Sequence, residues 1–153
     1  MNYEQIQSLV DNIYNEYNVI TPYKDIYRIL DDIGIIIYEK QFLNSYEDDC
    51  IIDNRIFLIS NKNNYVRLAT LLGHFLLQLP EDNTYETSLP CNAFAVMFLI
   101  PEFEMQKDLK ELSKKYGVSE DIAYYREQIF LDKQFLMCYN ALVVKISNDK
   151  FGI

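Results

Sequence analysis

Apolar residues in the first part of the chain recur every three or four positions, which places them on one face of a helix. The first such stretch covers residues 3–17, with Ile6, Leu9, Val10, Ile13, Tyr14 and Tyr17 on the apolar face. A second begins at Thr21 and Pro22, a capping residue and a residue suited to a first helical turn. We expect it to end at Gly34, because glycine takes a left-handed backbone conformation without steric cost.

The pattern then changes to short, β-branched runs. Residues 35–38 form a continuous apolar run, which predicts a strand covered on both faces. After a polar loop at 40–48, the runs 50–52 and 56–59 flank Asp53, Asn54 and Arg55, as in a tight hairpin. These segments together predict a small antiparallel or mixed three-stranded sheet.

The second half of the chain is expected to be helical. A long apolar helix is predicted over 65–79, capped by Asn63 or Asn64 and closed by Pro80. A polar loop at 81–87 leads to a helix ending at Pro101, followed by helices over 102–116 and 120–130. Between 131 and 147 the period does not decide between helix and strand. With no repeat or linker, we expect one domain over 1–153, with a core at 3–101 and a helical C-terminal extension at 102–153.

Charge and rare residues restrict the chemistry. The 153 residues carry 23 acids against 14 bases, a net charge of -9, which disfavours a nucleic-acid partner. The single histidine, His74, excludes sites that need two imidazoles. Cys50, Cys91 and Cys138 form no C-x-x-C pair, and their odd number is typical of a reducing compartment. Without a signal peptide or an apolar run long enough to span a bilayer, a cytoplasmic location without membrane partners is expected.

Two linked segments carry a family resemblance. RLATLLGHFLLQL at 67–79 and PCNAFAVMFLIP at 90–101 resemble the ImmA/IrrE family of bacterial metallopeptidase-like domains, in which an AHELGHFLLH helix precedes an EAN-x-FA-x-x-LL-x-P helix. The matching positions are Ala69, Leu72, Gly73, His74, Phe75, Leu76, Leu77, Asn92, Phe94, Ala95, Leu99 and Pro101. The resemblance covers residues 3 to about 130. It implies an α+β, zincin-like fold, with the small sheet packed on an active-site-type helix and a helical C-terminal half.

The metal-binding positions of that family are not kept. In an H-E-x-x-H helix two histidines bind zinc and the glutamate polarises water, but here Thr70 and Leu71 replace the first histidine and the glutamate. The family's third ligand is an acid near the second motif, where Glu86 is the nearest candidate. The resemblance therefore implies a pseudopeptidase without catalytic residues or cofactor, with His74 and Glu86 as the residual metal candidates.

Other interpretations of these residues stay open. His74 can be a hydrogen-bonded core residue, and Cys91 either a thiolate ligand or a small buried hydrophobe. An active zinc endopeptidase with an atypical site would need His74, Glu86 and Cys91 to converge on one point. A Cys-His nucleophile pair would lack a recognisable oxyanion or orienting group. Residues that would line a pocket for a partner are His74, Thr70, Cys91 and Asn92.

The segment 108–128 is similar to the first half of a helix-turn-helix, with Gly117 in the turn. Its second helix offers Tyr124, Tyr125, Arg126 and Gln128 as residues that could reach bases, although Glu120 and Asp121 stand where phosphates would approach. A small DNA-binding regulator is therefore one alternative, and a packed helical pair that closes the core is the other.

Members of the ImmA/IrrE family cleave or contact bacterial transcriptional repressors, commonly beside a helix-turn-helix protein. Since the ligand positions are lost, the resemblance implies a regulatory protein-binding module, encoded by a phage, another mobile element or the host. Its expected partner is a transcriptional regulator of the helix-turn-helix type, bound without being cut.

Overall fold

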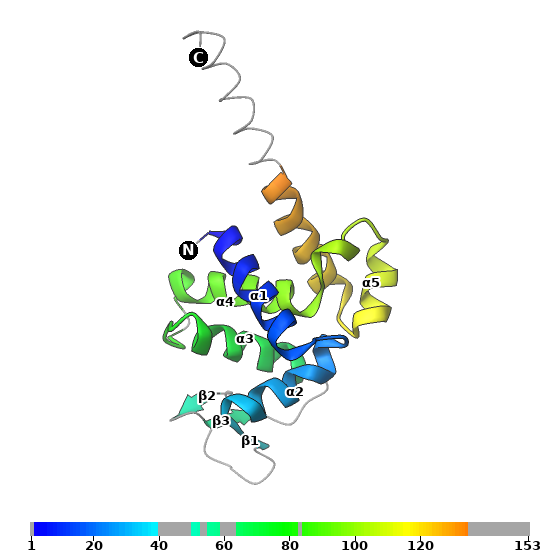
Figure 1. Ribbon diagram of the computed structural model, residues 1–153. Helices are drawn as coiled ribbons and strands as arrows, with labels where there is room; N and C mark the ends of the chain where they lie inside the picture. The colour runs from blue at the N-terminus through cyan, green and yellow to red at the C-terminus, as the bar shows by residue number, and fades with distance from the viewer. Residues whose placement is uncertain (1, 40–49, 53–54, 59–63, 83, 135–153) are drawn as a thin grey trace.

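The computed structural model describes residues 2–39, 50–52, 55–58, 64–82 and 84–134 (Figure 1). Its first helix, α1 (Tyr3–Tyr17), begins with a capping box, in which Asn2 Oδ1 accepts from Gln5 N at 2.9 Å and Gln5 Oε1 accepts from Asn2 N at 3.1 Å. The apolar face expected from the sequence is the one that the structure buries, through Ile6, Val10 and Ile13.

The second helix, α2 (Pro22–Ile33), ends as predicted at Gly34, which adopts φ 86°. Its N-terminus is capped differently from the expectation, because the Thr21 side chain makes no capping bond. Asp25, inside the first turn, accepts hydrogen bonds from the amides of Ile20 and Thr21 at 2.9 Å each. These bonds lower the pKa of Asp25, although burial acts in the opposite direction.

Three short strands follow, β1 (Ile36–Glu39), β2 (Cys50–Ile52) and β3 (Arg55–Leu58), in the order β1-β3-β2. β1 pairs with β3 in parallel, with Ile37 opposite Ile56, and β2 pairs with β3 antiparallel, with Ile51 opposite Ile56. The predicted hairpin turn at 53–54 and the polar loop at 40–48 lie outside the described residues. Figure 1 shows the sheet at one end of the molecule, beside α2 and α3.

The centre of the molecule is a pair of long helices, α3 (Asn64–Leu76) and α4 (Tyr85–Leu99). A short connection joins them, and they run antiparallel (Figure 1). From Ala93 to Leu99 every residue of α4 is buried. Helix α4 begins inside the polar loop expected at 81–87, where Asp82 accepts from the Thr84 amide at 3.0 Å and from its hydroxyl at 2.9 Å.

The rest of the described chain packs on this pair. A 3₁₀ turn, η1 (Glu102–Glu104), leads to α5 (Leu109–Tyr116), which ends at Gly117 with φ 65°. A further helix runs over 120–134 and buries Ala123, Arg126 and Ile129. The continuous helix expected over 102–116 is therefore divided in two, and residues 135–153 of the expected extension lie outside the described part.

The predicted fold class, an α+β zincin-like domain, is wrong. The described structure is mainly helical, and among the residues whose burial is described nearly all of the buried apolar ones belong to helices. The three strands contain only three or four residues each and lie at the periphery. The strand at 35–38 was expected to be covered on both faces, yet Ile36 is 50% exposed. The apolar helices pack against one another, and the sheet does not form the centre of the core.

Across the described ranges, none of the helices has the length and apolar character needed to cross a membrane.

Candidate functional site

The degenerate H-E-x-x-H positions lie on α3. Leu71, at the glutamate position, is fully buried in the core. Thr70, at the first histidine position, is 9% exposed, and its hydroxyl donates to the Val66 carbonyl of its own helix at 3.1 Å. The residue that would activate water is thus a core residue, and the one that would bind metal is bonded to the backbone one turn earlier.

His74 is 5% exposed and belongs to the C-terminal turn of α3. Its Nδ1 lies 3.3 Å from the Leu79 carbonyl oxygen, and the Leu79 amide donates to the His74 carbonyl at 3.0 Å. A carbonyl only accepts, so the Nδ1 carries the proton in this contact, and Nε2 is the nitrogen left for a ligand. The reciprocal bonds show that His74 holds the chain where it leaves the helix.

The other sequence-predicted residues belong to α4 and point in different directions. Cys91 is fully buried, whereas Asn92 and Glu86 are exposed. Burial raises the pKa of the Cys91 thiol to about 11, which keeps it protonated at neutral pH. The proposed pocket residues are therefore not gathered at one accessible surface, since Cys91 faces the interior and Asn92 faces solvent.

Close packing explains where Cys91 lies. A Cβ built on Gly73 of α3 would stand 3.0 Å from Cδ1 of Phe94 and 3.1 Å from the carbonyl oxygen of Cys91. These distances are shorter than ordinary van der Waals contacts, so the glycine of the GHF sequence lets α3 and α4 approach closely. Within the residues described, no group of three or more His, Cys, Asp and Glu side chains is placed to hold a metal ion.

The predicted helix pair at 108–128 is present, as α5 and the N-terminal part of the helix over 120–134. Arg126, expected as a base-reading residue, is completely buried, and the Tyr125 hydroxyl is also buried. Lys107 and Lys115, two basic residues before the turn, form ion pairs with the Glu104 carboxylate at 2.7 and 2.9 Å. The helix pair therefore packs on the core. Arg126, the residue that the DNA-binding alternative needs at the surface, is part of this packing.

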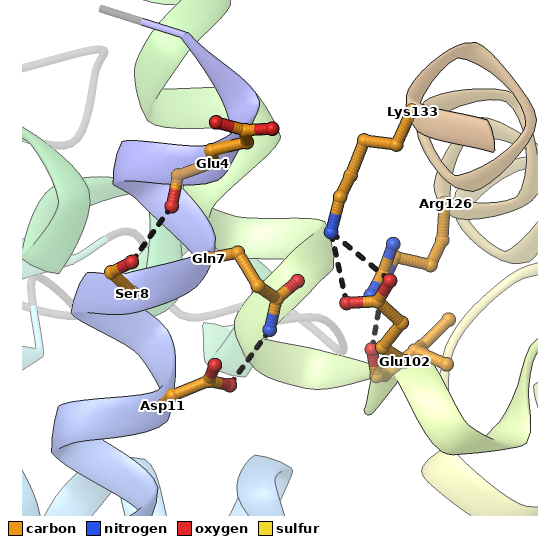
Figure 2. Close-up of polar contacts among 8 residues, drawn as sticks. Glu4, Gln7, Ser8, Asp11, Glu102, Arg126 and Lys133 are labelled. Carbon is orange, nitrogen blue, oxygen red and sulfur yellow. Dashed lines mark hydrogen bonds and ion pairs between the residues drawn. The ribbon is translucent and has the colours of Figure 1, made fainter. Parts of the chain in front are cut away.

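Sequence reasoning missed a polar cluster around that arginine. Arg126 Nε donates to the Ile100 carbonyl at 2.9 Å, while Nη1 and Nη2 are buried and have no hydrogen-bond partner among the described residues. Nearby, Lys133 Nζ binds both carboxylate oxygens of Glu102, at 3.0 and 2.9 Å. Figure 2 shows Arg126 beside Glu102, with Gln7 and Asp11 of α1 on the facing side.

Desolvation lowers the pKa of Arg126 to about 10, so the guanidinium stays charged at neutral pH even though it is buried. The sequence does contain a signal for this burial. Arg126 stands three and four positions from the apolar residues Ala123, Ile122, Ile129 and Phe130, which places it on the apolar face of its helix.

Comparison with known proteins gives a likeness to solved structures. No family model matches the sequence, and no curated protein matches it. Among solved structures, the chain is similar to one described as a Mycobacterium tuberculosis transcriptional regulator, with a TM-score of 0.60 and 15% sequence identity. The match covers 80% of this chain and 46% of that chain, so this protein spans less than half of the regulator's length. At this identity the likeness shows a shared fold, which supports the helical architecture over the predicted zincin-like one.

Proposed function

We propose that this protein is a regulatory protein-binding module, a catalytically inactive relative of the ImmA/IrrE metallopeptidases that binds a transcriptional regulator without cleaving it. In this proposal the α3–α4 pair corresponds to the helices that carry the metal ligands in the active family members. The resemblance of the 67–79 and 90–101 segments to that family supports the assignment.

The burial of Leu71 carries the proposal. A general base has to reach the attacking water, and in a zinc peptidase it stands beside the metal. Leu71 has no titratable group and is enclosed by the core. A catalytic zinc also needs three protein ligands with one open position, whereas the Thr70 hydroxyl is bonded to Val66 and Glu86 is exposed.

A regulatory role is supported by the structural neighbour. The matched fold there forms part of a longer chain that is named a transcriptional regulator. In the present chain the net charge of -9 disfavours direct contact with nucleic acid and favours a protein partner. A basic partner such as a DNA-binding regulator would be attracted by this field, which raises the association rate at low salt.

The experiment is reconstitution with a purified partner. Helix-turn-helix regulators of the source organism that co-purify with the tagged protein are expressed separately, mixed with it and examined by native and intact-mass spectrometry. We expect a stoichiometric complex in which the partner keeps its full mass, both with added zinc and with a chelator. A His74→Ala variant should bind the partner with unchanged affinity if it folds.

Two results would overturn the proposal. Cleavage of the partner that requires zinc and is lost in the His74→Ala variant would establish an active peptidase with an atypical site. Failure of every purified regulator to bind would reject the regulator-binding role.

A further inference from the structure

A cavity of about 260 Å³ lies between α1, the end of α4 and η1. One part of its lining is apolar, formed by Val10, Met97, Pro101 and Phe103. Phe103 is also 80% exposed, so it stands at the mouth of the cavity. The volume is below the range typical of sites for drug-sized molecules, and it suits a small metabolite.

The polar part of the lining offers hydrogen-bond acceptors. Gln7 Nε2 donates to Asp11 Oδ1 at 2.8 Å, which fixes the amide so that Oε1 faces away from Asp11. That oxygen is buried, and no residue in the described part of the chain forms a hydrogen bond with it. In Figure 2 it points across the space toward the Glu102–Lys133 pair. Tyr14, which also lines the cavity, donates its proton to the Phe98 carbonyl. A ligand here therefore has to supply donors to the α1 side.

Arg126 lies behind the same lining. Three of the lining residues, Asp11, Tyr14 and Glu102, are near enough to act electrostatically on its guanidinium. Nevertheless neither terminal amino group has an acceptor within the described ranges. The carboxylate of Glu102 is bound by Lys133 through both oxygens. Unpaired buried donors cost about 1–3 kcal/mol, and more when they are charged, so the cluster lacks an acceptor for Arg126.

The charged groups around Arg126 indicate which kind of ligand could supply the acceptor for its terminal amino groups. Arg126 and Lys133 supply two positive charges against the two negative charges of Glu102 and Asp11, so a ligand that leaves this balance unchanged carries one charge of each sign. On the opposite side, the Gln7 oxygen and the exposed carboxylate of Asp11 call for a positively charged donor. A molecule with a carboxylate and an ammonium group close together satisfies both sides.

We propose that this cavity binds a free α-amino acid with an apolar side chain. Its carboxylate pairs with the terminal amino groups of Arg126, its ammonium group donates to Gln7 and Asp11, and its side chain lies along Val10, Met97 and Phe103. The guanidinium lies behind the lining in the free protein. Small side-chain movements on binding are common, and the proposal requires a shift of Gln7 or Glu102 that opens the cavity toward Arg126. This proposal does not depend on the regulator-binding role.

The test titrates the full chain with L-leucine by NMR chemical-shift perturbation. Two probes of the same shape dissect the recognition, namely 4-methylpentanoate, which lacks the ammonium group, and 3-methylbutylamine, which lacks the carboxylate. We expect saturable binding of L-leucine and at least about tenfold weaker binding of each probe, since each loses one charged interaction. Shifts should be confined to residues of α1, η1 and the end of α4.

Variants locate the site. Phe103→Ala should weaken L-leucine binding several-fold, whereas Tyr85→Ala, which removes another highly exposed aromatic ring (77%), should leave it unchanged. Arg126→Met should abolish binding, and if that variant does not fold, Gln7→Leu takes its place. The proposal is overturned if L-leucine does not bind saturably, if 4-methylpentanoate binds as tightly, or if the Tyr85→Ala and Phe103→Ala variants lose affinity equally.

Discussion

Gly73 of α3 faces the backbone of Cys91 in α4, with so little space between the two helices that a Cβ at position 73 would stand 3.1 Å from the Cys91 carbonyl oxygen and 3.3 Å from its Cα. Backbone atoms in the middle of a helix cannot turn aside as a flexible side chain can. This contact therefore fixes the spacing of the central helix pair, on which the other described elements pack.

Replacing Gly73 with alanine should destabilise the protein. Alanine favours a helix by about 1 kcal/mol over glycine, but the overpacking against Cys91 and Phe94 costs about 1–3 kcal/mol. We expect a lower free energy of unfolding in urea, followed by circular dichroism. Ser8→Ala, on the exposed side of α1, is the control and should change stability by no more than about 0.5 kcal/mol. A Gly73→Ala variant that is more stable than wild type would contradict the close contact.

Leu71→Glu restores the family's general-base residue at a position that is closed to solvent. A carboxylate buried there without a partner should lower the free energy of unfolding by more than about 3 kcal/mol or prevent folding. Leu71→Met keeps the volume and should cost less than about 1.5 kcal/mol. Urea unfolding of both variants separates the effect of the buried charge on stability from the effect of the altered side-chain shape. Equal stability of the two would mean that the position reaches solvent and that the site is open.

Glu104 should give the fold a specific dependence on acid. Its carboxylate is 5% exposed and pairs with Lys107 and Lys115, whose side chains are about half exposed. The hydrogen bond from Lys107 contributes most, followed by that from Lys115, and together they lower the folded-state pKa of Glu104 below its ordinary value of 4.5. The stabilisation is therefore complete above pH 4.5 and is lost as the pH falls through the folded-state pKa.

The measurement compares Glu104→Gln with wild type. We expect the variant to be less stable by about 1–2 kcal/mol at pH 7, a value reduced by solvent screening of the lysines. The difference should shrink as the pH is lowered from about 5 to 3, because wild-type Glu104 then takes up its proton. Urea unfolding at a series of pH values provides the curve. A constant difference across this range would show that the ion pairs do not supply the stability.

Cys91 should be chemically inert in the folded protein. With its pKa raised to about 11 by burial, roughly one molecule in a thousand carries the thiolate at pH 8. In a Cys50→Ser, Cys138→Ser background, reaction with a thiol-specific disulfide reagent should be slow in buffer and fast in urea. Rapid modification of the native protein at pH 8 would show that Cys91 is accessible. Cys91 would then again be a candidate ligand for zinc.

Local signals in the sequence predicted the helices well because each helix carries its own pattern of apolar residues and its own end signals. The bounds of α1 and α2 follow from their apolar faces and from Gly34, and Gly117 ends α5 as the turn residue expected between two helices. The strands at 36–39, 50–52 and 55–58 were also found, because β-branched runs bounded by polar residues are local features.

Features that depend on contacts between distant residues were not predicted. The strand residue Ile36 is half exposed because the apolar helices occupy the centre of the molecule. The residues around Ile36 in the sequence do not indicate this packing between distant helices. Arg126 was named as a residue that could reach bases if the 108–128 helix pair bound DNA, whereas in the structure it is completely buried. Its burial depends on the Ile100 carbonyl, 26 residues earlier. The acceptor groups of the cavity come from α1 and η1, which are adjacent only after folding.

The hydrogen bond from the Tyr14 hydroxyl to the Phe98 carbonyl spans 84 residues, and it constrains the order in which the molecule can assemble. Helices α3 and α4 are joined by a short connection and can pair early, since closing a short loop costs little entropy. Helix α1 precedes α4 by some 70 residues in the chain, yet it packs against α4. Its apolar face therefore stays without this partner until α4 has been made. The N-terminal helix is thus the segment most open to chaperones, proteases or premature association while the chain is being made.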